Sequence, residues 1–281
     1  MAFETLTSPD GVVWRRSSLL ARAEVPHGFS TRLGGVSAAP FESLNLGLAD
    51  APGETDSWSN VSENWRRFLA AVGLQQRLLV RARQVHGQQV LQPDLQPHAV
   101  RAEPPFADGD ALVTADARHA LAVRVADCAP VLLADRHAGL VAAVHAGWRG
   151  LVGGVVIAAL QRMLDRGARA DRVVAAVGGC IGAGAFQVGP DVRQAMQEVG
   201  LGAFVTPDAA APDRWRADLR GGIVAQLAEG GVGGERVDVD PSCTVDCRAE
   251  LFSYRREGAR DRKSTRLNSS HVSESRMPSS A

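Results

Sequence analysis

The segment LAVRVADCAPVLLA, which runs from Leu121 to Ala134, decides the fold because it is apolar over almost its whole length. Half-buried strands alternate apolar and polar residues, whereas strands covered on both faces read as continuous apolar runs. Asp127, Cys128 and Pro130 interrupt the middle of the run, and a proline cannot donate to the ladder of a central strand. We therefore predict two buried strands that meet at a break, with the thiol of Cys128 at that break.

Strand-like and helix-like segments alternate on both sides of this run. Apolar runs with turn signals at their ends indicate strands, and apolar residues three or four apart indicate helices. The expected strands cover 25–31, 78–85, 111–114, 140–144, 173–177 and 236–239. The expected helices cover 151–164, 190–199 and 216–228, with Pro190 as a favourable first residue. These elements predict one globular domain over residues 1–262.

The composition bounds the function. Lys and Arg together number 31, as do Asp and Glu, and no basic block stands out in the body of the chain. We therefore expect a small-molecule substrate and neither a nucleic-acid nor a membrane partner. The first residues lack the features of a signal peptide, and the longest apolar run, 151–160, is too short to cross a bilayer. A cytoplasmic protein with reduced thiols is expected.

The residues after Arg262 have a different character. Lys263 is the single lysine of the chain, and it opens a serine-dense polar stretch that runs to Ala281. Its wording resembles translated adaptor or vector sequence, so we expect residues 263–281 to be foreign to the fold and poorly ordered. A native disordered tail is the alternative.

Three apolar segments each end in a strong metal ligand or proton carrier, namely His86, Cys128 and His145. If these ends meet at one rim of a sheet, two imidazoles and a thiolate form a first shell for Zn²⁺ with one position left for water or substrate. Such an open site predicts catalysis. Taken singly, a buried cysteine is also typical of a small core residue, and a histidine at a strand end is typical of a satisfied core residue.

Short motifs that belong together are spread along the body of the chain. They are Phe29-Ser30-Thr31-Arg32, Gly34-Gly35-Val36-Ser37, Asn45-Leu46-Gly47, Gln84-Val85-His86-Gly87, Asp110 to Thr114, Ala126 to Pro130, His145 to Gly150 and Phe252-Ser253-Tyr254-Arg255-Arg256. In this set the chain closely resembles the YfiH family, whose members carry the labels laccase-domain protein and polyphenol oxidase. The resemblance runs from about His27 to Gly258. It implies an α+β fold, a layered α/β/β/α sandwich of mixed sheets similar to the cysteine-hydrolase-like domain of cytotoxic necrotizing factor.

The resemblance also implies a function. It predicts a cytoplasmic metalloenzyme that phosphorolyses adenosine, inosine and S-methyl-5′-thioadenosine, with adenosine deamination as a companion activity. By position, the metal and catalytic triplet of the family falls on His86, Cys128 and His145. Zinc is the expected metal and copper the alternative, the partners are purine nucleosides and phosphate, and self-association stays open. The chain departs from the family after the arginine pair, where Gly258 to Arg262 replaces a Thr-Gly-Arg-like segment and a closing helix.

The two activities need different groups. Zinc lowers the pKa of bound water from ~15.7 towards about 7, which suits attack on C6 of a purine. Phosphorolysis needs guanidinium and amide donors that align phosphate with the glycosidic carbon. Arg149 at a predicted helix start, and Arg32 with Ser30 beside a glycine-rich turn, are the candidates, with surface ion pairs as the alternative for both arginines. Asp127 either orients a ligand imidazole or moves a proton, or it satisfies backbone amides at the strand break.

Two other functions compete with this one. Cys128 as nucleophile, His145 as general base and His86 as orienter would form a hydrolase for an amide such as a cell-wall precursor, active in peptidoglycan editing. A copper-dependent polyphenol oxidase is the other. Multicopper oxidases need many histidines, commonly as His-X-His pairs, and the chain has no such pair among its seven.

Overall fold

The structure, a computed structural model, describes residues 3–47, 55–95, 107–257 and 269–273. A first sheet has the spatial order β1 (Phe3–Thr7), β2 (Val13–Ser17), β3 (His27–Ser30), β15 (Ser269–Ser273), β7 (His119–Val125) and β4 (Leu78–Val80). A second sheet has the order β14 (Val237–Val239), β10 (Val174–Val177), β8 (Ala129–Asp135), β9 (Leu140–Ala146), β6 (Ala111–Thr114) and β5 (Val90–Leu91). A small third sheet contains β11 (Gln187–Val188), β13 (Trp215–Ala217) and β12 (Val205–Pro207). Both large sheets combine parallel and antiparallel pairs, so the fold is of the mixed α+β class.

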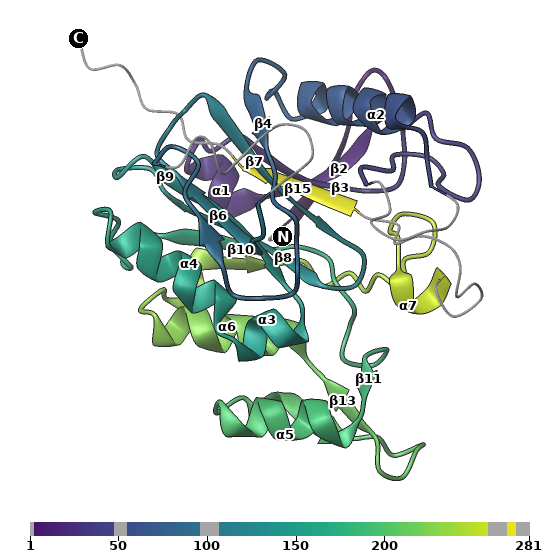
Figure 1. The fold of residues 1–281 in the computed structure, drawn as a ribbon, viewed down its shortest axis with the longest axis vertical. Coiled ribbons are helices and arrows are strands. Elements are labelled where there is room, and N and C mark those ends of the chain that lie inside the picture. Colours follow the sequence, from purple (N-terminus) through teal and green to yellow (C-terminus); the bar gives the residue numbers. More distant parts are fainter. Residues whose placement is uncertain (1–2, 48–54, 96–106, 258–268, 274–281) are drawn as a thin grey trace.

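Helices cover the outer faces of the two large sheets (Figure 1). The helices are α1 (Ser18–Arg22), α2 (Trp58–Ala71), α3 (Trp148–Val152), α4 (Val155–Leu164), α5 (Pro190–Glu198), α6 (Leu219–Glu229) and α7 (Tyr254–Glu257), with 3₁₀ turns at Gly202–Phe204 and Gly234–Arg236. Trp65 and Phe68 of α2 pack on the first sheet, while α4 and α6 pack on the second. A third cluster, which includes Phe29, Leu121 and Leu132, fills the space between the sheets. The layers therefore run from α2 through both sheets to α4 and α6.

The central strands β8 and β9 are buried on both faces, which explains their apolar sequences. Every residue of both strands is buried. Val131 and Leu133 of β8 face α4 and α6, whereas Leu132 between them faces the first sheet. Successive side chains of a strand point to opposite faces, so a strand between two apolar layers has no place for alternating polar residues. The predicted pair of strands on either side of Cys128 is confirmed as β7 and β8.

Other predicted elements differ at their ends. The helix expected over 151–164 is two helices, α3 and α4, because Gly154 adopts a φ of +77° between them. The helix expected over 216–228 begins later, since residues 215–217 pair with β11 and β12. The strand expected over 78–85 ends at Val80, and residues 81–85 are irregular apart from a bridge between Arg83 and Asp108 before the bend at His86.

The structure describes a short part of the tail after Arg262, and it also bears on the membrane prediction. Ser269–Ser273 form β15, antiparallel to both β3 and β7, and the expected lack of order of the tail stays a prediction. The foreign origin of residues 263–281 stays a prediction, and the departure at Gly258 to Arg262 lies outside the described residues. Within the described parts of the chain, no helix is long and apolar enough to cross a membrane.

Candidate active site

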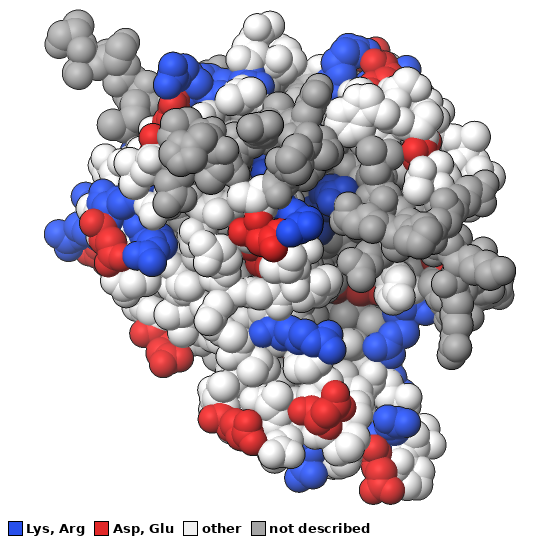
Figure 2. Space-filling model, in the orientation of Figure 1, with Lys and Arg blue, Asp and Glu red and all other residues white. Residues whose placement is uncertain are grey.

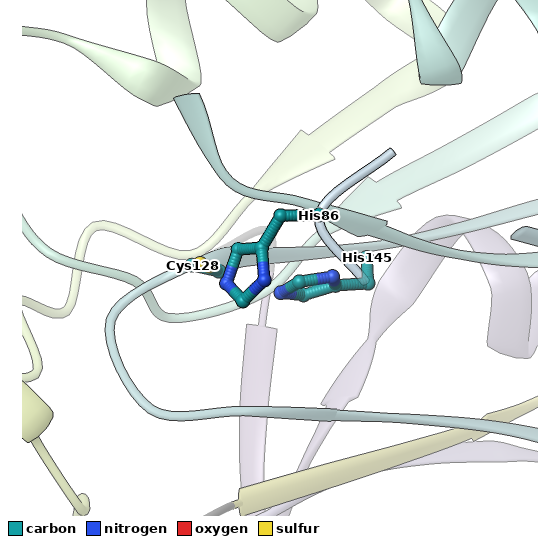
Figure 3. Close-up of side chains that lie close together, drawn as sticks. All are labelled: His86, Cys128 and His145. Carbon is teal, nitrogen blue, oxygen red and sulfur yellow. The ribbon is translucent and has the colours of Figure 1, made fainter. Parts of the chain in front are cut away.

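The structure brings His86, Cys128 and His145 together at one end of the second sheet (Figure 3). Their ligand atoms all lie within 4.8 Å of one another. The two imidazole rings meet edge to face, with centroids 4.8 Å apart. His145 is buried, whereas His86 and Cys128 are partly exposed, so the cluster has one open side.

The pairing of β8 with β9 places two of the three ligands. Ala129 pairs with Ala146 and Pro130 with His145, so Cys128 comes opposite Gly147 at the end of the ladder. A Cβ atom on Gly147 would lie 2.8 Å from Cys128 Sγ and 3.2 Å from His86 Cδ2. The first contact is shorter than real Cβ atoms make and the second is tighter than most, so a side chain at this position would push Cys128 Sγ out of the cluster.

A buried carboxylate folds the turn that carries the third ligand. Asp110 accepts hydrogen bonds from the backbone N–H groups of Val85, His86 and Gly87, at 3.2, 2.9 and 2.7 Å. His86 adopts a φ of +61°, a strained conformation that such bonds hold in place. The side chain of Gln84 fixes the same turn to β7, since it both donates to the backbone oxygen of Arg124 and accepts from its N–H.

Asp110 also holds the ring of His145, one of the three candidate ligands. Its Oδ1 lies 2.7 Å from His145 Nδ1, which leaves Nε2 as the ring atom that faces the cluster. Burial favours the protonated acid, yet the hydrogen bond and charge of His145 and the N–H groups of Gly87 and Val85 outweigh it and lower the pKa of Asp110. A carboxylate behind an imidazole ligand is the usual support of a zinc-bound histidine. The sequence analysis missed Asp110 as a site residue, although it directly precedes a buried strand inside a family motif.

Cys128 and His145 form a charge pair when no metal is bound. Burial by itself would raise the pKa of the thiol, but the charge of His145 and hydrogen bonds from both histidines lower it from 9.0 to about 6. Burial would lower the pKa of His145, but the Cys128 thiolate and the bond to Asp110 raise it from 6.5 to about 9. A preformed thiolate among two imidazoles is a donor set that suits zinc, so these residues fit the predicted metal.

The cluster opens into a cavity of about 520 Å³. Ligand cavities of a few hundred Å³ accept molecules of nucleoside size. Apolar side chains line one part, and they include Ile181, Phe186 and Tyr254. Arginines contribute the charge: Arg124 of β7, Arg149 of α3 and Arg255 of α7. Figure 2 shows basic side chains on the surface over α3 and beside α7.

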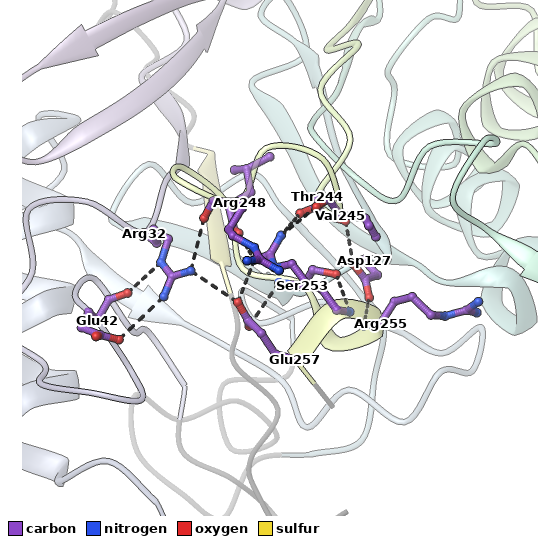
Figure 4. A network of polar contacts seen from close by, with 11 residues as sticks. Arg32, Glu42, Asp127, Thr244, Val245, Arg248, Ser253, Arg255 and Glu257 are labelled. Atoms are coloured by element: carbon purple, nitrogen blue, oxygen red, sulfur yellow. Dashed lines mark hydrogen bonds and ion pairs between the residues drawn. The ribbon is translucent and has the colours of Figure 1, made fainter. Parts of the chain in front are cut away.

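Asp127 lies at the break between β7 and β8, and its carboxylate accepts two hydrogen bonds there. It adopts a φ of +97°, and its carboxylate accepts from the hydroxyl of Thr244 at 2.6 Å and from the backbone N–H of Arg255 at 2.5 Å (Figure 4). His145 is held by Asp110 and not by Asp127. The carboxylate therefore satisfies one backbone amide and one hydroxyl, and a role for Asp127 in proton transfer stays a prediction.

Of the expected phosphate contacts, Arg149 alone lines the cavity. Arg32 lies elsewhere: its guanidinium donates to the backbone oxygens of Glu42 and Arg248 and pairs with Glu257 at 3.3 Å (Figure 4). This placement favours the ion-pair alternative for Arg32. Ser30 is buried within β3, away from the cavity lining, because all four residues of that strand are covered. Sequence reasoning did not single out Arg124 or Arg255.

The chain is similar to known proteins over most of its length. The family described as multi-copper polyphenol oxidoreductase laccase matches residues 26–266. The chain is 41% identical over 233 residues to a protein of Deinococcus radiodurans named purine nucleoside phosphorylase, covering 83% of this chain and 84% of that one. It is 37% identical over 232 residues to purine nucleoside phosphorylase YfiH of Shigella flexneri, covering 81% and 87%. The crystal structure of YlmD from Geobacillus stearothermophilus superimposes with a TM-score of 0.80 at 28% identity over 94% of this chain and 96% of that chain. The chain therefore belongs to the YfiH family of laccase-domain proteins.

Proposed function

We propose that the chain is a zinc-dependent purine nucleoside phosphorylase that acts on adenosine, inosine and S-methyl-5′-thioadenosine, with adenosine deamination as a side activity. The observation that carries the proposal is the three-ligand cluster at the floor of a cavity lined by arginines. The names of the relatives support the same reaction. Adenosine, inosine and phosphate are then the small-molecule partners.

Zinc held by His86, Cys128 and His145 would supply a Lewis acid at the open side of the cluster. Copper stays the alternative metal. Among the residues that the structure describes, a single group of three or more His, Cys, Asp and Glu side chains is placed to hold an ion. That arrangement argues against the several copper centres of a multicopper oxidase.

The other residues of the cavity bind and align the two substrates. In phosphorolysis an oxygen of phosphate forms a bond to C1′ of the ribose while the bond from C1′ to the base breaks, and the base leaves with the electron pair. The guanidinium of Arg149 has no hydrogen-bond partner among the described residues, and it lies over the ring of Trp148, 4.4 Å from the centroid. Such a cation is free to hold the phosphate by paired N–H donors. Apolar side chains such as Ile181 and Phe186 would cover the base.

The experiment is to incubate metal-loaded protein with inosine or adenosine, with and without phosphate, and to separate the products. Release of hypoxanthine and ribose 1-phosphate that depends on phosphate is the expected result, and chelation should abolish it. His145→Ala should remove both bound metal and turnover. If the protein converts adenosine to inosine but never releases a free base, it is a deaminase only. That result would overturn the phosphorylase proposal.

A cysteine hydrolase is the second candidate, because Cys128, His145 and Asp110 are arranged as a thiol, a base and an orienting carboxylate. This likeness agrees with the cysteine-hydrolase-like fold that the family resemblance implies. The carboxylate occupies the orienting place that the sequence analysis gave to His86. A second imidazole on the thiolate, His86, is redundant for a hydrolase and required for a metal. A hydrolase would keep its activity after chelation and lose it on alkylation of Cys128.

A further inference from the structure

The C-terminal segment carries an arginine into the same cavity as Arg149 and the metal-ligand cluster. Arg255 belongs to α7, more than a hundred residues after α3, yet both side chains line the cavity. Neither guanidinium has a carboxylate partner among the described residues. Within the described parts of the chain, the cavity therefore contains two guanidinium groups that form no ion pair.

The guanidinium of Arg255 makes contacts within the protein that use only some of its hydrogen-bond donors. One of its nitrogens donates to the backbone oxygen of Gln187 at 3.1 Å, and its plane lies over the ring of Phe186, 5.5 Å from the centroid. A guanidinium has five N–H donors, so most of them stay available for a ligand. A planar cation with a fixed direction and unused donors is suited to bind an anion with two or more oxygens.

Asp127 sets the position of this arginine through the backbone. Its carboxylate takes the N–H of Arg255 on one oxygen and the hydroxyl of Thr244 on the other. Among the described residues that line the cavity it is the single acidic one, and both of its oxygens accept these bonds. Because Asp127 directly precedes Cys128, one residue links α7 to the metal-ligand loop.

We propose that Arg255 binds the phosphate together with Arg149, and that Asp127 is the positioning residue that holds Arg255 at a fixed distance from the cluster. The inference rests on the proposed phosphorylase function, since inorganic phosphate is then the anion. The 5′-phosphate of a nucleotide offers the same chemistry. The assay distinguishes the two sources. If the arginines bind the 5′-phosphate of a nucleotide, inosine 5′-phosphate is a substrate; if they bind inorganic phosphate, inosine 5′-phosphate competes with it.

The test compares zinc-loaded variants in two measurements, the binding of inorganic phosphate by calorimetry and the KM values for phosphate and inosine. Arg255→Gln should raise both the Kd and the KM for phosphate about ten- to a hundredfold, with the KM for inosine and the zinc content unchanged, and Arg255→Lys should recover part of the loss. Arg193→Gln is the matched control, because Arg193 also stacks on an aromatic ring, that of Trp215, but lies outside the cavity lining.

Two variants of Asp127 test the positioning role. Asp127→Gly suits the φ of +97° and removes both acceptors, so it should raise the KM for phosphate about tenfold without loss of zinc. Asp127→Asn can accept from the Arg255 N–H and donate to Thr244, so it should restore phosphate binding. An unchanged Kd for phosphate in Arg255→Gln would overturn the inference even if the wild type is a phosphorylase. A wild type that binds phosphate through Arg255 but releases no base would instead overturn the proposed function.

Discussion

Replacing Asp110 by asparagine removes one charge and one acceptor oxygen from behind the metal-ligand cluster. In the structure, Oδ1 accepts from His145 Nδ1 and from the N–H of His86, and Oδ2 accepts from the N–H groups of Val85 and Gly87. Asparagine offers a single oxygen. In either orientation of the asparagine side chain, its NH₂ group replaces one carboxylate oxygen and faces the two N–H donors that this oxygen accepted from.

The size of the effect follows from these four contacts. The smallest loss arises if the amide oxygen stays towards His145, which leaves the N–H groups of Val85 and Gly87 without an acceptor. A buried donor without a partner costs about 1–3 kcal/mol, and since these two N–H groups are only part-buried, the lower end applies and the free energy of unfolding should fall by about 2 kcal/mol. The imidazole also loses the charge that supports it, and loss of such a carboxylate weakens metal binding by about 10- to 100-fold.

The assay is a competition for zinc between each variant and a chromophoric chelator, together with urea unfolding of the zinc-free protein. Asp135→Asn is the matched control, because Asp135 is equally buried and accepts from the N–H groups of His137, Ala138 and Arg169. It ends β8, whereas the cluster lies at the start of that strand. The control should be destabilised with its zinc affinity intact. Zinc binding of wild-type strength in Asp110→Asn, or an equal loss in the control, would refute the reasoning.

Further predictions concern the close contact at Gly147, the protonation of His27 and the ion pairs of Arg32. Gly147→Ala should abolish zinc binding while the fold stays intact by circular dichroism, because its methyl would lie 2.8 Å from the Cys128 sulfur; full zinc occupancy would contradict the account of the cluster. Burial lowers the pKa of His27 from 6.5 to about 4, and its Nε2 accepts from the N–H of Ser17, so the folded state needs the neutral ring. The unfolded state then binds the extra proton, and about 3 kcal/mol of stability present above pH 6.5 should be lost as the pH falls towards 4; His27→Leu should remove this slope in urea unfolding, and a slope that persists would assign it to other groups. Arg32→Gln should leave the KM for phosphate unchanged while it lowers the melting temperature, and a raised KM would return Arg32 to the binding site.

The sequence predicted the central strands well, because their burial on both faces leaves a continuous apolar pattern. The apolar runs around Cys128 and His145 could only fit strands covered on both faces, and β8 and β9 are such strands. Neighbouring antiparallel strands then bring the end of one and the start of the other to one edge. This pairing brings Cys128 and His145 together, whereas the turn held by Asp110 adds His86. The roles of the three residues in catalysis stay a proposal.

Contacts between distant segments escaped the sequence analysis. Asp110 binds His145 and Arg255 reaches the cavity through tertiary placement, which no local pattern encodes. The helix α2 had a local signal that was not used, since Ser57 caps it and buried Val61, Trp65 and Phe68 recur at helical spacing.

X-ray absorption at the zinc edge of the reconstituted protein tests the central claim most directly. The account predicts one ion per chain with two nitrogen neighbours at about 2.0–2.1 Å and one sulfur at about 2.3 Å, plus one light atom. The sulfur should vanish in Cys128→Ser and one nitrogen in His86→Ala. A zinc shell without sulfur in the wild type, or one that Cys128→Ser leaves unchanged, would contradict the assignment of His86, Cys128 and His145 as the metal site.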